Sequence, residues 1–150
     1  MTANGSQIVK LEFTSSFEML DFVQVVCDYV SRGIGLDEDS SHWVSVAIRE
    51  SVINAIKHGN RNDERKHVFV DFETSTPAAG PELTIRVRDQ GEGFEPEEVA
   101  DPLAPENLLK SSGRGIFLIR NFMDDVRLQK VPQGGMQISM TKRVPQTEAR

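Results

Sequence analysis

Alternating apolar and charged residues predict several short strands along this chain. In the segment 8–14, Val9, Leu11 and Phe13 alternate with charged or polar residues, which is typical of a strand with one buried face. Similar alternation predicts further strands over 68–72, 83–89, 126–131 and 136–143. Pro132 to Gly135 supplies turn residues between the last two, so these are expected to form a closing hairpin.

Apolar residues at helical spacing predict three helices between the strands. Ser15 and Glu18 have the spacing of a capping box, and the first helix is expected to follow them and continue to about residue 32. Asp37 or Asp39 can cap a second helix that runs to residue 58. The segment 115–123 is apolar on most sides and is therefore expected to be a buried helix.

The order of these elements indicates an α+β fold. Strands near both ends with helices between them suggest one mixed, mostly antiparallel sheet with helices packed on one face, a two-layer α/β sandwich. Residues 1–150 are expected to form a single domain with its core over about 8–143. The segment 95–112 contains three prolines and lacks a clear pattern, and a long irregular segment inside a compact domain is often a functional lid.

Composition narrows the class of protein. The net charge is −6 and no basic patch is evident, which argues against direct nucleic-acid binding. The sequence has no apolar run long enough to span a bilayer and no start typical of a signal peptide. Its single cysteine, Cys27, lies in an apolar helical stripe and is expected to be a buried thiol. These features together favour a cytoplasmic protein without membrane contact.

Glu50 and Asn54 form the first candidate pair for chemistry. They lie four residues apart on the second predicted helix, so they are neighbours on one face, and the apolar residues beside them suggest partial burial. An ordinary surface pair on an amphipathic helix explains an isolated pair of this kind. The functional interpretation is that the Asn54 amide oxygen binds Mg²⁺, which prefers oxygen ligands. Glu50 would then act as a base toward an attacking hydroxyl near a terminal phosphate.

Asp89 is the second candidate. It shares parity with the apolar residues of the strand over 83–89, so it is expected to point to the buried face, where a carboxylate needs a donor such as the amino group of adenine. Gly91 and Gly93 would let the backbone approach a flat ligand closely. The alternative is a strand-end aspartate that begins a turn.

The third candidate is the run Gly113-Arg114-Gly115, which is expected to open the helix over 115–123. Backbone N–H groups at a helix start can hold phosphate oxygens, and glycines allow them to come close. Arg114 could add positive charge. A lid hinge with a solvated basic residue is the other interpretation.

The three stretches in this order resemble the ATP site of the GHKL superfamily, which includes gyrase-type ATPases, heat-shock chaperones, histidine kinases and mismatch-repair ATPases. Residues 50–59 resemble the N box of the anti-sigma-factor serine kinases, 89–94 the first glycine box, and 112–116 with 119–125 the second glycine box and the helix after it. The resemblance covers about 8–143. It implies the histidine kinase-like ATPase fold, with ATP and Mg²⁺ as cofactors.

The resemblance also assigns roles to residues. Glu50 matches the catalytic base, Asn54 the Mg²⁺ ligand and Asp89 the adenine-reading acid, while 95–112 matches the ATP lid. Gly91, Gly93, Gly113, Arg114 and Gly115 complete the expected nucleotide site. Met136 stands where the family often has a threonine of the adenine pocket, so base preference or affinity can differ here.

By the same resemblance, the chain is expected to be a homodimer that holds a sigma factor inactive. It would also phosphorylate a serine on a competing anti-anti-sigma protein of the STAS type. One alternative is a nucleotide-gated module that switches partners without useful kinase activity. Another is the catalytic half of a two-component histidine kinase, but no phosphoacceptor histidine precedes the second helix.

Overall fold

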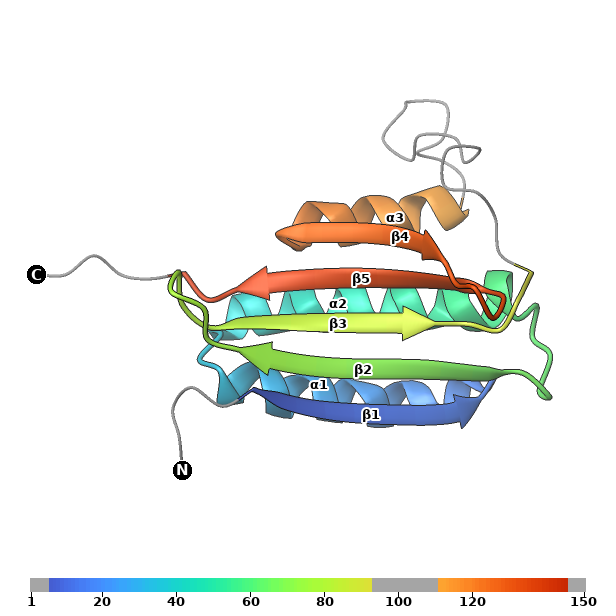
Figure 1. The fold of residues 1–150 in the computed structure, drawn as a ribbon, viewed down its shortest axis with the longest axis horizontal. Coiled ribbons are helices and arrows are strands. Elements are labelled where there is room, and N and C mark those ends of the chain that lie inside the picture. The colour runs from blue at the N-terminus through green and yellow to red at the C-terminus, as the bar shows by residue number, and fades with distance from the viewer. Residues whose placement is uncertain (1–5, 93–110, 146–150) are drawn as a thin grey trace, which may run out of the picture.

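The fold is an antiparallel sheet covered on one face by helices (Figure 1). The computed structural model describes residues 6–92 and 111–145, with the backbone alone for 111–116. Its five strands have the order β1-β2-β3-β5-β4, and they span Gln7–Thr14 (β1), His67–Ser75 (β2), Glu82–Arg88 (β3), Asp125–Lys130 (β4) and Met136–Arg143 (β5). The expected α+β sandwich is confirmed. Each pairing of these strands is antiparallel, so the described sheet is not mixed as the sequence suggested.

The sheet has one apolar face because the side chains alternate as the sequence predicts. Val68, Val70 and Phe72 on β2 lie within the core. Val87 and Ile85, the β3 partners of Val70 and Phe72, are buried with them. The opposite face carries Phe69 among polar and charged residues such as Asp71 and Arg86. Burying one face of each strand fixes the strand register, since a slip of one residue would turn every apolar side chain outward.

Helices α1 (Leu20–Gly33), α2 (Glu38–Asn54) and α3 (Ser111–Phe122) lie against the apolar face (Figure 1). The apolar residues of α2 form a core stripe, since Val44, Ala47, Ile48 and Val52 are all buried, as is Ala55 just after the helix. Asp37 caps α2 by accepting a hydrogen bond from the Ser40 N–H at 2.7 Å. Cys27 on α1 is buried, as expected.

The prediction that Ser15 caps the first helix was wrong. Ser16, not Ser15, caps the short 3₁₀ turn Phe17–Met19 that leads into α1, and its hydroxyl accepts from the Glu18 N–H at 3.2 Å. Ser15 is buried instead, and its hydroxyl donates to the Lys66 carbonyl at 2.8 Å. The sequence pattern alone does not show which of the two serines caps the turn. Ser15 is unavailable because its hydroxyl bonds to the loop before β2.

Helix α3 begins earlier than the sequence predicted. It starts at Ser111, so Gly113, Arg114 and Gly115 lie within its first turns rather than before it. The expected lid, 95–112, falls outside the described residues except for Ser111 and Ser112, which belong to α3.

Candidate functional site

Asp89 lies at the end of β3 on the helix-covered face, with an exposed fraction of only 6%. Its Oδ1 accepts hydrogen bonds from the Gly91 N–H at 2.9 Å and the Met136 N–H at 3.1 Å, and its own N–H donates to the Met136 carbonyl at 3.0 Å. Both donors therefore bind the same carboxylate oxygen. In the described part of the chain, Oδ2 receives no hydrogen bond, so it can accept one from a ligand.

Burial raises the pKa of the Asp89 carboxyl above its ordinary value. The backbone N–H groups of Gly91 and Met136 act in the opposite direction, as do the charges of Lys66 and Arg88. A charged carboxylate in this buried position lowers the stability of the folded protein. Perturbed carboxyls of this kind occur often at functional sites.

Three glycines form a cradle around Asp89. A Cβ atom added to Gly59 would overlap the Asp89 carboxylate, and one added to Gly135 would overlap the Asp89 carbonyl oxygen. A Cβ atom on Gly91 would overlap the Gly59 carbonyl. The sequence had indicated Gly91 as part of the site, but it had treated Gly59 as a helix end and Gly135 as a turn residue. A cradle built from three separate segments is recognisable only once the fold brings them together.

A π-helical turn brings Gly59 to Asp89. The turn spans Ala55–Gly59 at the end of α2, and the Asn60 N–H closes it by donating to the Ala55 carbonyl at 2.8 Å. Such turns are wider than an α-helical turn and occur often at functional sites. The predicted second helix thus reaches about as far as expected, but its last turn changes type.

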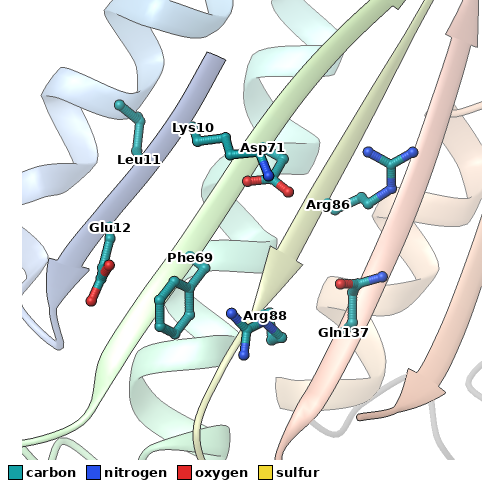
Figure 2. Close-up of a pocket in the computed structure, with 8 residues that line it drawn as sticks. All are labelled: Lys10, Leu11, Glu12, Phe69, Asp71, Arg86, Arg88 and Gln137. Atoms are coloured by element: carbon teal, nitrogen blue, oxygen red, sulfur yellow. The ribbon is translucent and has the colours of Figure 1, made fainter. Parts of the chain in front are cut away.

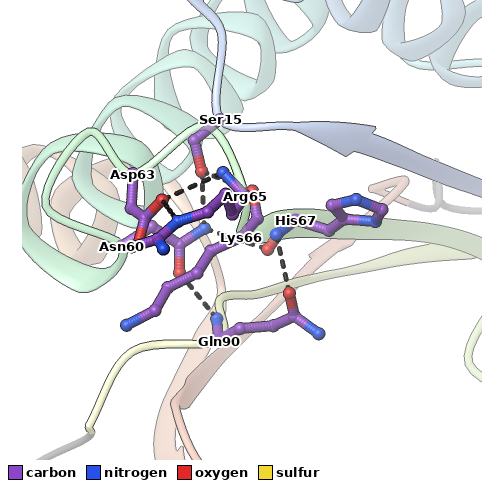
Figure 3. A network of polar contacts seen from close by, with 7 residues as sticks. All are labelled: Ser15, Asn60, Asp63, Arg65, Lys66, His67 and Gln90. Atoms are coloured by element: carbon purple, nitrogen blue, oxygen red, sulfur yellow. Dashed lines mark hydrogen bonds and ion pairs between the residues drawn. The ribbon is translucent and has the colours of Figure 1, made fainter.

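Asn60 connects this turn to three strand ends (Figure 3). Its Nδ2 donates to Ser15 Oγ at 2.8 Å and to the His67 carbonyl at 2.9 Å, and its Oδ1 accepts from the Gln90 N–H at 2.7 Å. The Gln90 side chain in turn accepts from the His67 N–H at 2.7 Å. Neither Asn60 nor Gln90 was identified from sequence, where Asn60 reads as a residue that ends a helix.

Glu50 and Asn54 lie on α2, which continues into the π-helical turn that ends at Gly59. Both side chains are half-buried, as expected, and neither has a hydrogen-bond or ion-pair partner among the described residues. At 1.5 Å of rise per residue, Glu50 and Asn54 lie about 6 Å apart along the α2 axis. Asn54 therefore lies between Glu50 and the turn whose last residue, Gly59, touches Asp89.

The remaining predicted residues are described only in part. Gly113, Arg114 and Gly115 have a helical backbone at the start of α3, and α3 packs against α2. Gly93 lies outside the described residues. Whether these residues meet the Asp89 cradle therefore stays a prediction.

A separate hollow of about 320 Å³ lies on the open face of the sheet, away from the helices. Figure 2 shows Arg88 beside Phe69 within it, and the guanidinium carbon lies 3.9 Å from the ring centroid. Arg88 precedes Asp89 on β3, so the two side chains point to opposite faces. The hollow is consequently not part of the Asp89 site.

Comparison with known proteins places the chain in a family. Residues 15–142 match the histidine kinase-like ATPase domain, so the chain belongs to that family. Among the helices that the structure describes, none is long and apolar enough to cross a membrane.

Over most of its length the chain is similar to bacterial proteins named as a serine-protein kinase and an anti-sigma factor. It is 28% identical to the serine-protein kinase RsbW of Staphylococcus epidermidis, with 95% of this chain and 90% of the relative covered. It is 28% identical to the anti-sigma F factor of Oceanobacillus iheyensis, with 93% and 94% covered. The crystal structure of the RsbU and RsbW domains of Rv1364c from Mycobacterium tuberculosis shares the fold, with a TM-score of 0.61, 17% identity, and 91% of this chain and 32% of that one covered.

Proposed function

We propose that this chain is an ATP-dependent protein serine kinase that also acts as an anti-sigma factor. The observation that carries the ATP site is Asp89, a buried carboxylate with one oxygen held by two backbone N–H groups and the other without a donor among the described residues. The glycines around it let three backbone segments come close to Asp89, which a side chain at any of them would prevent. The names of the similar proteins support the kinase and anti-sigma roles.

Asp89 recognises the base in this proposal. Its free Oδ2 accepts a hydrogen bond from the adenine 6-amino group, while Gly91 and Met136 hold Oδ1 in place. A buried acceptor without a partner is unfavourable, so a base that offers a donor is selected over one that does not. Met136 contributes through its backbone N–H, which any residue except proline would supply. The substitution of the family's threonine at this position is therefore compatible with adenine binding.

Glu50 and Asn54 act at the phosphate end. Asn54 fits Mg²⁺, since its amide has no hydrogen-bond partner among the described residues and Mg²⁺ takes oxygen ligands, often one or two from protein and the rest from phosphates and water. When bound, the ion neutralises charge that develops on the transferred phosphoryl group. Glu50 accepts the proton of the attacking serine hydroxyl, a role for which its half-buried and unpaired carboxylate is suited. Gly113, Arg114 and Gly115 hold phosphate oxygens at the start of α3.

The partners follow from the similarity to the anti-sigma F factor and to RsbW. We expect one sigma factor, one anti-anti-sigma protein of the STAS type that receives the phosphate, and a second copy of this chain in a homodimer. A regulator of this kind acts in the cytoplasm.

Phosphotransfer from γ-labelled ATP with Mg²⁺ into native cell extract tests the proposal. Wild-type protein is expected to label one small protein on serine, and Glu50→Gln is expected to bind ATP normally but give no label. Glu38→Gln is the matched control, because it removes an exposed carboxylate from the first turn of the same helix. Equal labelling by Glu50→Gln would exclude Glu50 as the base. Normal ATP binding by the wild type without any label would favour a nucleotide-gated partner switch instead.

A further inference from the structure

Asn60 is completely buried and nearly all of its hydrogen-bonding capacity is used. Its exposed fraction is 0%, both amide hydrogens have acceptors, and Oδ1 has one donor. A buried amide is costly unless its partners are in place, and a satisfied network specifies one arrangement of the segments that it joins. The contacts in Figure 3 join the ends of β1, α2 and β3 to the start of β2.

One of these contacts reaches the base site. The Gln90 N–H belongs to the peptide group whose carbonyl is that of Asp89, and it donates to Asn60 Oδ1 at 2.7 Å. On the other side of Asp89, its own N–H donates to the Met136 carbonyl at 3.0 Å. The backbone on both sides of Asp89 is therefore held by two bonds from different segments, and this backbone is the base from which the carboxylate reaches the Gly91 and Met136 N–H groups.

We infer that Asn60 is a positioning residue for nucleotide selectivity, which acts by holding the Asp89–Gln90 peptide so that Asp89 Oδ2 meets the 6-position of the base. The inference rests on the proposed function. Adenine presents an amino donor at this position and guanine presents a carbonyl oxygen, which a fixed carboxylate repels. A carboxylate that can turn away loses the bond to adenine and relieves the repulsion by guanine, so both effects reduce selectivity.

Two variants separate this role from general stabilisation. Asn60→Ala removes the acceptor for the Gln90 N–H together with both donors. Ser15→Ala removes one partner of the Asn60 amide and leaves the bond to Gln90, so it is the matched control. Asn60→Asp keeps an oxygen for the Gln90 N–H while it replaces the donors.

The test measures dissociation constants for Mg·ATP and Mg·GTP by calorimetry, below the melting temperature of each variant. In Asn60→Ala the preference for ATP over GTP is expected to fall by about ten- to a hundredfold, chiefly through weaker ATP binding. Ser15→Ala should be less stable than the wild type but keep the preference within about twofold, and Asn60→Asp should keep most of it. The inference would be overturned if Asn60→Ala preferred ATP over GTP as strongly as Ser15→Ala does. It would also be overturned if Asn60→Asp lost this preference.

A measurement on the wild type covers the case in which Asn60→Ala does not fold. If base recognition depends on the bond between Asn60 and Gln90, then binding of the base must strengthen that bond, because the coupling is reciprocal. Amide hydrogen exchange at Gln90 is expected to slow with ATP and to change little with GTP. Exchange that ATP leaves unchanged would overturn the inference. A wild-type protein that binds no ATP would instead refute the proposed function.

Discussion

Gly59, the last residue of the π-helical turn after α2, and Asp89, just after β3, touch so closely that no side chain fits between them. A Cβ atom on Gly59 would overlap both Oδ2 and Cγ of the Asp89 carboxylate. The backbone of Gly59 is therefore one wall of the proposed base pocket. This contact also ties the helix that carries Glu50 and Asn54 to the strand that carries Asp89.

Replacing Gly59 by alanine is expected to abolish ATP binding. The new methyl group displaces the Asp89 carboxylate, and overpacking of this kind costs about 1–3 kcal/mol of unfolding free energy. Calorimetry with ATP and a thermal melt would measure the two effects. The matched control is Gly33→Ala, since a Cβ atom on Gly33 meets nothing within 4 Å. Gly33→Ala should bind ATP normally, and normal binding by Gly59→Ala would show that Asp89 does not contact the base.

Asp89→Asn is expected to lose ATP selectivity and to gain stability at neutral pH. Because burial raises the pKa of Asp89 in the folded protein, the native state binds the proton more tightly than the unfolded chain does. Below the ordinary carboxyl pKa of 3.8, Asp89 is protonated in both states and its burial costs the wild type no charge. As the pH rises from there through the raised folded pKa, the wild type loses unfolding free energy.

The measurement is urea denaturation of both proteins between pH 4 and 8. The stability advantage of Asp89→Asn should shrink as the pH falls and should stay constant above the folded pKa. Gln137→Ala serves as a control on the neighbouring strand β5, since this uncharged side chain lies on the open face. An advantage that does not depend on pH would mean that the Asp89 carboxyl has the same pKa in the folded and unfolded states.

Sequence periodicity predicted the elements well because this sheet has one buried face and α2 has one apolar stripe. The same parity argument placed Asp89 in the interior before the structure did. It did not predict the roles of Gly59, Gly135 or Asn60, because each matters through a contact with a residue distant in sequence. The π-helical turn was also not predicted, since it depends on the register between Asn60 and Ala55 rather than on residue type.

Cys27 is expected to resist alkylation in the folded protein. Burial raises the pKa of its thiol to about 12, while the hydrogen bond with Ser31 lowers it and the charge of Asp28 raises it. The reactive thiolate is therefore scarce as well as inaccessible, and modification has to proceed through opening of the structure. Labelling with a thiol reagent should follow global unfolding in urea and should be fast only above the midpoint. A native protein that reacts at the rate of an exposed thiol would contradict the buried position of Cys27.

The fluorescence of Trp43 should report on the position of α3, because Trp43 on α2 stacks against Phe122 on α3. The rings of Trp43 and Phe122 are parallel to within 10° with their centroids 4.0 Å apart, and Trp43 is the only tryptophan of the chain. Such a pair contributes about 0.5–1.5 kcal/mol beyond its buried area. Phe122→Leu should therefore lower the unfolding free energy by roughly this amount and shift the emission of Trp43 to longer wavelength.

The same stack makes Trp43 sensitive to ligand binding at the other end of α3. If Gly113 and Gly115 hold phosphate oxygens there, ATP should change the Trp43 emission of the wild type, and this change should be much smaller in Phe122→Leu. Fluorescence titration with ATP measures both. Phe69→Leu is the control, since Phe69 lies on the open face of the sheet and should leave the response intact. Saturable ATP binding without any change in Trp43 emission would mean that α3 does not move or repack when nucleotide binds.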